Sequence, residues 1–144
     1  MQNLTPVGKN LNKVLHVSIE CKGTTLAHVL VDTGSSLNVL PKGALDRLDC
    51  EGLVLKPSDI VVRDFDGSKK IVHRDVDLPI KVGSHIFNST FYVMDIRPAY
   101  SCLLGRSWIH GAGAVTSILH QKIKYQVKGK IVTVCGEEEF MSVI

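Results

Sequence analysis

One aspartate, Asp32, stands where a carboxylate could do acid–base chemistry. It follows the run "HVLV" (28–31) and enters the turn Thr33-Gly34, after which two serines lead back to apolar residues and a proline. A threonine hydroxyl can orient a carboxylate, and a glycine lets a backbone N–H approach it without an intervening Cβ. The tripeptide alone would also fit an ordinary strand end, but the buried approach favours a carboxylate positioned to move protons.

Short strands must carry this turn. Apolar and polar residues alternate in short runs that Gly, Asp, Asn and Pro interrupt, which predicts a mainly β fold. Short helices are expected only at 41–49, where Pro41 fits a first-turn position, and at 106–114. The stretches "HVLVDTGSS" and "AYSCLLGRS" echo each other weakly, as in a β-barrel built from two similar halves. The runs that predict strands are 13–20, 25–32, 37–40, 59–65, 69–82, 85–95, 101–105, 121–127 and 130–136.

The bulk composition indicates one globular domain over residues 1–144. Hydrophobic residues make up 44% of the chain and charged residues 22%, and the length suffices to bury a core. The net charge of +3 comes from scattered lysines and arginines, so we expect no direct binding to nucleic acid. Since no run suits a membrane span and the N-terminal stretch lacks the apolar core of a signal peptide, we expect an intracellular protein that is neither membrane-bound nor secreted.

Neither the cysteines nor the histidines predict a metal site. The six histidines include no pair at helical spacing, and we expect no metal and no other cofactor. The four cysteines show none of the CxxC or CxxH spacings of zinc sites. We interpret them as small hydrophobic residues of the core: Cys21, Cys50, Cys102 and Cys135.

Three stretches of the sequence together match the motifs of a known family: "VDTGSSLNVLPK" (31–42), "VRDFDGSKK" (62–70) and "FYVMDIRPAYSCLLGRSWIHGAGAV" (91–115). With them the chain resembles the retropepsin-like aspartic proteases, particularly those of plant Ty3/Gypsy-type retrotransposon polyproteins. The stretch 91–115 contains the family's second landmark, two apolar residues and a glycine. Order and spacing agree over about 12–128, which would be the core, followed by an extended C-terminal hairpin and a tail to 144. The resemblance implies a closed, β-barrel-like fold with a single Asp-Thr-Gly per chain.

The resemblance also implies an aspartic endopeptidase that processes a retrotransposon polyprotein, in the cytoplasm or within virus-like particles. Such enzymes use two carboxylates that share one proton: one activates a water, and the other polarises the scissile carbonyl. Since the sequence holds no second Asp-Thr-Gly or Asp-Ser-Gly, the partner of Asp32 must be Asp32 of another copy. A homodimer with one active site on its two-fold axis follows. The expected catalytic residues are Asp32, Thr33 and Gly34, with the two threonines hydrogen-bonded across the axis.

Further site residues follow from the same resemblance. The stretch 62–70 would be a flap whose tip folds over an extended peptide and excludes water. An ordinary surface hairpin would have the same sequence pattern. Substrate contacts would come from Ser35, Phe65, Asp66, Gly67 and Ser68. Structural support of the site would come from Leu103, Leu104, Gly105 and Arg106.

Three features depart from the retroviral pattern. Ser35 stands where many retroviral proteases have alanine, and its hydroxyl would stabilise the ionised Asp32. The usual acidic partner of the arginine at position 106 is replaced by Ser36, so Arg106 must pair elsewhere. The chain also runs on well beyond Gly105, so the interface that retroviral dimers build from both termini would be replaced or weak.

Other functions stay open at this point. A catalytically inactive retropepsin-like module for peptide binding or dimerisation would have the same fold, although the intact "DTGSS" argues against it. A purely structural β-barrel would explain the strands but not the ordered set of motifs. A regulatory or shuttle-type cellular retropepsin would differ in its flanking domains.

Overall fold

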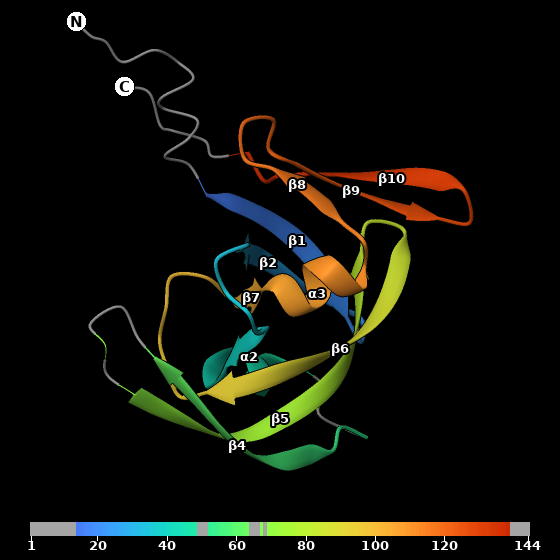
Figure 1. Ribbon diagram of the computed structural model, residues 1–144. Coiled ribbons are helices and arrows are strands. Elements are labelled where there is room, and N and C mark those ends of the chain that lie inside the picture. The colour runs from blue at the N-terminus through green and yellow to red at the C-terminus, as the bar shows by residue number, and fades with distance from the viewer. Residues whose placement is uncertain (1–13, 49–51, 64–66, 68, 139–144) are drawn as a thin grey trace, which may run out of the picture.

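The computed structural model describes residues 14–48, 52–63, 67 and 69–138. These residues form ten strands and two short helices (Figure 1). The mainly β architecture with two short helices confirms the predicted fold class. Along the chain the elements are β1 (Leu15–Cys21), β2 (Thr24–Val31), β3 (Val39–Pro41), α2 (Lys42–Arg47), β4 (Leu55–Arg63), β5 (Lys69–Val82), β6 (His85–Met94), β7 (Cys102–Leu104), α3 (Arg106–Gly111), β8 (Val115–Ser117), β9 (Lys122–Val127) and β10 (Lys130–Cys135).

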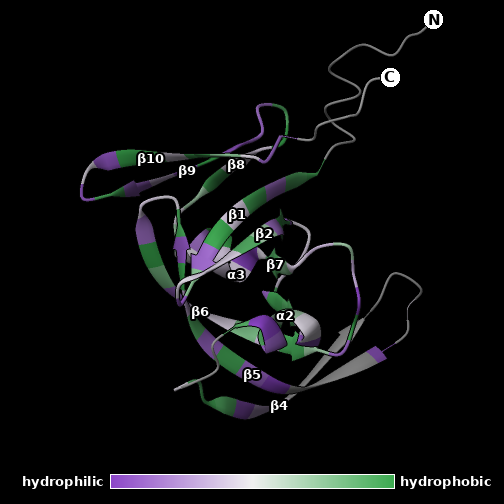
Figure 2. Cartoon of the chain, turned by 180° about the vertical axis from the view of Figure 1, so that it is seen from behind, coloured by the Kyte–Doolittle hydropathy of each residue, from purple (hydrophilic) through white to green (hydrophobic). Residues whose placement is uncertain are grey.

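Six strands close into a barrel in the order β1-β2-β7-β3-β6-β5, and β5 returns to pair with β1. The remaining strand of this sheet, β4, pairs with β5. Alternation along the strands explains the barrel, because successive side chains point to opposite faces. In β1, Leu15, Val17 and Ile19 are buried in the core, and the residues between them are half-buried or exposed. Figure 2 shows the same alternation as hydrophobic and hydrophilic bands along β1 and β5.

Two parallel pairings position the motif residues. β2 pairs in parallel with β7, and β3 pairs in parallel with β6. β2 and β7 are the strands of the two stretches that echo each other in the sequence. Because parallel strands end at the same edge of a sheet, the residues that follow β2 and β7 come together at one end of the barrel.

The strands β8, β9 and β10 form a second, antiparallel sheet, which packs on the barrel. Its inner face contributes Ile123 and Tyr125, which are both buried. The Tyr125 hydroxyl donates a hydrogen bond to the carbonyl of Val82, next to the turn between β5 and β6. Phe87 of β6 lies edge-on against the rings of Tyr125 and Trp108. These contacts fix the C-terminal hairpin to the barrel.

The observed elements differ from the expected ones in several places. β3 begins at Val39 rather than at residue 37, and β4 begins at Leu55 rather than at residue 59. β8 was not expected at all, and both helices end earlier than predicted. The cysteine prediction holds for Cys21 and Cys102, which are buried, but it is wrong for Cys135. Cys135 is exposed because it ends β10, an edge strand of the second sheet. Cys50 lies outside the described residues.

No helix in the described part of the chain is long and apolar enough to cross a membrane. Within the same residues, no group of three or more His, Cys, Asp or Glu side chains is arranged to hold a metal ion.

Candidate active site

Asp32 leaves the barrel directly after β2. The last residues of β2 pair with β7, with Val29 opposite Cys102 and Val31 opposite Leu104. The backbone of Asp32 continues this pairing, because its amide donates to the carbonyl of Leu104 at 3.0 Å. The buried strand therefore delivers a half-buried carboxylate to the start of an exposed turn.

Gly34 holds one oxygen of this carboxylate. Its backbone amide donates to Asp32 Oδ1 at 2.9 Å. A Cβ at position 34 would lie 3.1 Å from the same oxygen, which is tighter than nearly all such contacts. A glycine at this position thus allows the amide and the carboxylate to meet, because it has no Cβ between them.

Gly105 packs against the loop that follows the turn. A Cβ on Gly105 would lie 2.2 Å from the carbonyl oxygen of Leu37 and 2.8 Å from that of Ser35. The next two amides, of Arg106 and Ser107, donate to the carbonyls of Ser35 and Ser36 at 2.7 and 3.2 Å. The start of α3 therefore supports the loop through backbone contacts that only a glycine at 105 permits. Both Leu103 and Leu104, which precede it, are buried.

The side chain of Arg106 reaches the turn itself. Its Nη1 donates to the carbonyl of Thr33 at 3.0 Å. The sequence required a partner other than the usual acidic residue, and the structure gives a backbone carbonyl of the candidate active-site turn. Arg106 thus holds the turn between Asp32 and Gly34.

Ser35 makes a different contact from the expected one. Its Oγ donates to the carbonyl of Leu37 at 2.9 Å, so its proton is used within the loop and not on the carboxylate of Asp32. The expectation that this hydroxyl stabilises the ionised carboxylate of Asp32 is therefore wrong for the contacts seen in the structure. The Ser35 hydroxyl closes the loop on itself.

Asn38 has a structural role that the sequence analysis missed. It is 1% exposed, and its Oδ1 accepts a hydrogen bond from the amide of Gly105 at 2.9 Å. Its Nδ2 donates to the carbonyl of Thr90 on β6 at 3.1 Å. One side chain thus ties the loop after Asp32 both to the second landmark and to the barrel. The available signal was a polar residue inside the apolar run 37–40, since buried polar groups are nearly always hydrogen-bonded.

The hairpin expected to be a flap is present. β4 and β5 pair up to Arg63 opposite Lys69. In the connecting loop, Gly67 has a φ of +81°, a left-handed conformation that favours glycine. The other predicted substrate contacts in this loop, Phe65, Asp66 and Ser68, lie outside the described residues.

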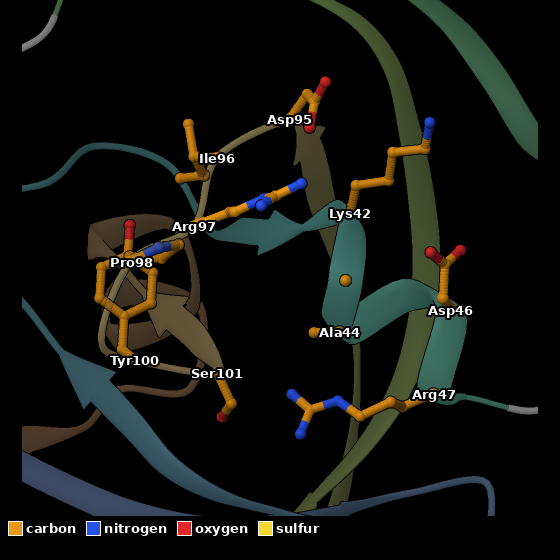
Figure 3. Close-up of a pocket in the computed structure, with 11 residues that line it drawn as sticks. Lys42, Ala44, Asp46, Arg47, Asp95, Ile96, Arg97, Pro98, Tyr100 and Ser101 are labelled. Carbon is orange, nitrogen blue, oxygen red and sulfur yellow. The ribbon is translucent and has the colours of Figure 1, made fainter.

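A pocket of about 570 Å³ lies between α2 and the segment 95–101. Figure 3 shows Arg47 and Arg97 extending into the space between these two segments. Three cationic residues line it, Lys42, Arg47 and Arg97, together with two carboxylates, Asp46 and Asp95. Asp32 is not among the lining residues, so this pocket does not contain the candidate catalytic group.

The barrel contains two buried cysteines, Cys21 of β1 and Cys102 of β7. Burial raises the pKa of both the Cys21 and the Cys102 thiol. Since the thiolate is the nucleophilic form, neither offers an alternative reaction centre. Acid–base chemistry at Asp32 is what the arrangement can perform.

Comparisons with known proteins agree with this geometry. The profile of the family described as Aspartyl protease matches residues 17–108. The retroviral protease-like domain of Ddi1 from Leishmania major superimposes with a TM-score of 0.63 at 14% identity, covering 88% of this chain and 96% of that one.

A second solved structure, the EIAV protease in complex with the inhibitor HBY-793, superimposes with a TM-score of 0.60 at 25% identity. The match covers 75% of this chain and 96% of the EIAV chain. No curated protein sequence matches the chain. The family profile spans well over half of the residues and includes Asp32 and Gly105. The chain belongs to the aspartyl protease family.

Proposed function

We propose that the chain is an active aspartic endopeptidase with one active site, formed by Asp32 from two copies of the chain. The observation that carries the proposal is a single positioned carboxylate. Asp32 is held at its backbone by Leu104 and at Oδ1 by Gly34, in the only Asp-Thr-Gly of the sequence. Because the chemistry needs two carboxylates, the second must come from a symmetric partner.

The geometry suits the division of labour between two such carboxylates. The amide of Gly34 occupies Oδ1, which leaves Oδ2 to share the proton or to activate a water. With one Asp32 ionised and the other protonated, the first takes a proton from the water as it attacks the peptide carbonyl. The second polarises that carbonyl and neutralises the oxyanion that forms. Thr33, which is exposed beside Asp32, would brace its counterpart across the two-fold axis.

The substrate would be a peptide segment bound in extended form. The β4–β5 hairpin would cover it, pair with its main chain and exclude water, with contacts from Ser35 and from the loop residues Phe65, Asp66, Gly67 and Ser68. We further propose that the natural substrate is the polyprotein of a plant Ty3/Gypsy-type retrotransposon and that the protein acts inside the cell. The support for this source is the set of sequence motifs at 31–42, 62–70 and 91–115.

The test is cleavage of a peptide library by the purified chain between about pH 3 and 7. The Asp32→Asn variant should lose activity by about 10²–10⁴-fold or more, because it removes the proton-transfer group. Asp46→Asn is the matched control, since Asp46 is an exposed residue of α2 outside the motif. Cleavage that survives Asp32→Asn would refute the proposal. A wild-type chain that binds a statine-type peptide but cleaves nothing would support the inactive peptide-binding module instead.

A further inference from the structure

β2, the strand that leads into Asp32, contains a β-bulge. β1 and β2 pair with Val17 opposite Val29 but with Ile19 opposite Leu26, so two residues of β2 face the single residue Ser18. The two residues are Ala27 and His28. His28 has a φ of +60°, the left-handed conformation that non-glycine residues rarely adopt. Bulges of this kind occur beside active sites, where they change the direction of side chains.

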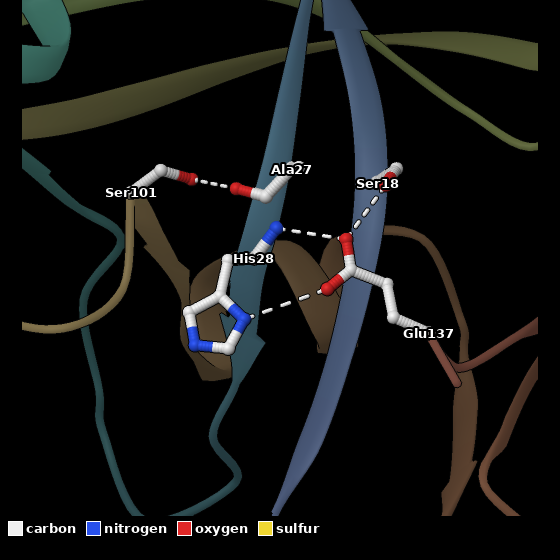
Figure 4. Close-up of polar contacts among 5 residues, drawn as sticks. All are labelled: Ser18, Ala27, His28, Ser101 and Glu137. Carbon is white, nitrogen blue, oxygen red and sulfur yellow. Dashed lines mark hydrogen bonds and ion pairs between the residues drawn. The ribbon is translucent and has the colours of Figure 1, made fainter. Parts of the chain in front are cut away.

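The carboxylate of Glu137 bonds to both sides of this bulge (Figure 4). Its Oε2 accepts from the backbone amide of His28 at 2.8 Å and from the hydroxyl of Ser18 at 2.6 Å. Its Oε1 lies 3.5 Å from Nδ1 of the His28 ring, an ion pair when the ring is protonated. The backbone of Glu137 is itself fixed, because its amide donates to the carbonyl of His16 at 2.7 Å.

Ser101 holds the same bulge from the side of β7. Its amide donates to the carbonyl of His28 at 3.1 Å, and its hydroxyl donates to the carbonyl of Ala27. The bulge is thus bonded to Ser101, which precedes β7, and to Glu137, which lies two residues after β10. These contacts come from segments that are far apart in the sequence.

The register of β2 decides where Asp32 points. After the bulge, Val29 to Val31 pair with β7, and Asp32 follows at once. If the bulge were lost, the pairing before it would continue and β2 would shift by one residue against β1. Such a shift turns every following side chain to the opposite face of the sheet. The carboxylate would then leave the position from which Gly34 and a second Asp32 can reach it.

We propose that Glu137 is a positioning residue for Asp32, because its carboxylate fixes the bulge that sets the register of the catalytic strand. The catalytic part of this inference rests on the proposed function. Under this proposal the segment after β10, which contains Glu137, is required for catalysis and is more than a C-terminal extension of the domain.

An ordinary surface ion pair between Glu137 and His28 would carry little weight, since exposed pairs contribute almost nothing. The contact to a backbone amide is different. The bulge takes the His28 amide out of the β1 ladder, and the loss of its acceptor would leave a half-buried donor unpaired. The side chain of Glu137 is only 25% exposed, which shields the contact from water.

The pKa of the Glu137 carboxyl provides a readout of the contact. Burial raises this pKa, but the hydrogen bonds from His28 and Ser18 outweigh it and hold the pKa below the ordinary 4.5. His28 and Glu137 line a pocket of about 720 Å³ together with other titratable and charged groups. These groups are His16, whose ring stacks on that of His28, and His120, Lys122, Cys135 and Glu138.

The test compares Glu137→Ala and Glu137→Gln with the matched control Glu138→Ala, the exposed neighbour of the same charge. Hydrogen exchange at the His28 amide, read by NMR, should accelerate by about tenfold or more in Glu137→Ala. It should stay near wild type in Glu137→Gln, whose amide oxygen can still accept, and in Glu138→Ala. In a pH titration the His28 amide shift should show an acid step with a midpoint below 4.5 that Glu137→Gln abolishes.

The catalytic readout follows from the same variants. Glu137→Ala should lower kcat by about tenfold or more with KM little changed. The reason is that the variant displaces the carboxylate of Asp32 and leaves the residues that contact the substrate in place. Glu137→Gln should restore kcat at neutral pH. Unchanged exchange at His28 in Glu137→Ala would overturn the inference, as would an unchanged kcat despite faster exchange. If the wild-type chain cleaves no peptide, the proposed function fails, and the exchange data still decide whether Glu137 fixes the bulge.

Discussion

The buried side chain of Asn38 joins the segment that follows Asp32 to the segment around Gly105. Its Oδ1 accepts a hydrogen bond from the amide of Gly105 at 2.9 Å. The contact spans residues that lie far apart in the sequence, and Asn38 also donates to Thr90 of β6 at 3.1 Å. The side-chain amide of Asn38 therefore holds the loop after Asp32 at two places. The position of the candidate catalytic turn depends on this buried polar contact.

Replacement of Asn38 by alanine should be strongly destabilising. It removes the partners of the buried Gly105 amide and of the half-buried Thr90 carbonyl. The cost is about 1–3 kcal/mol for the buried amide and less for the carbonyl, which water can reach. The free energy of unfolding from urea titration measures the effect. Asn88→Ala, at an exposed position of β6, is the control and should change stability by no more than about 0.5 kcal/mol. Equal effects of the two variants would show that the Asn38 contacts contribute no stability.

Gly105→Ala should disrupt the loop around the catalytic turn. The new methyl group would stand 2.2 Å from the carbonyl oxygen of Leu37, a backbone atom that cannot rotate away. We expect a loss of stability of about 3 kcal/mol or more, together with a loss of peptide cleavage. Gly111→Ala is the control, because Gly111 ends α3, the helix that Gly105 precedes, and a Cβ there would meet no atom within 4 Å. Wild-type stability in Gly105→Ala would contradict the close packing of α3 on the loop.

The C-terminal sheet should stabilise the barrel through the turn between β5 and β6. A Cβ at Gly83 would meet Val134 at 2.9 Å and the Tyr125 hydroxyl at 3.0 Å, at a φ of +70°. Gly129 has a similar φ of +78° but meets nothing within 4 Å. Gly83→Ala and Gly129→Ala should therefore share the backbone cost of about 1 kcal/mol, and Gly83→Ala should cost about 1–3 kcal/mol more. Equal thermal stabilities of the two variants would mean that the sheet is not docked at this turn.

Stability should fall in acid through Glu137. Because hydrogen bonds hold the folded pKa of this carboxyl below 4.5, its contribution is fully present above the ordinary pKa. The contribution is lost as the pH falls below 4.5 through the lower pKa of the folded state. Urea midpoints between about pH 2.5 and 7 should thus show a smaller acid loss for Glu137→Gln than for the wild type. Parallel curves for the two proteins would contradict the shifted pKa.

Features that depend on neighbouring residues, such as strands and turns, could be predicted from the sequence. Contacts between residues far apart in the sequence could not. Alternation in runs such as 69–82 predicts strands directly, since half-buried strands repeat every two residues. The beginning of β4 at Leu55 was missed because Pro57 interrupts the pattern of a strand, and β8 was missed because three residues carry no periodicity. These errors concern boundaries and one short edge strand, and they leave the fold class intact.

In the candidate site the same distinction holds. The turn at Asp32 and the landmark around Gly105 could be found because each motif is contiguous. The partners of Asn38 and Glu137 could not be found, because they depend on the pairing of strands and on a bulge in β2. For Arg106 the sequence predicted only that its partner is not the usual acidic residue. The fold identifies that partner as the carbonyl of Thr33.

The central claim is that two chains share one active site, and a mixing experiment tests it most directly. Wild-type chain is unfolded together with a ninefold excess of Asp32→Asn chain, the mixture is refolded, and peptide cleavage is measured per wild-type chain. Refolding with the same mass of an unrelated protein is the control. With random pairing in a two-fold dimer, activity per wild-type chain should fall to about one-tenth, because most wild-type chains then face an asparagine. Undiminished activity per wild-type chain would contradict the shared site.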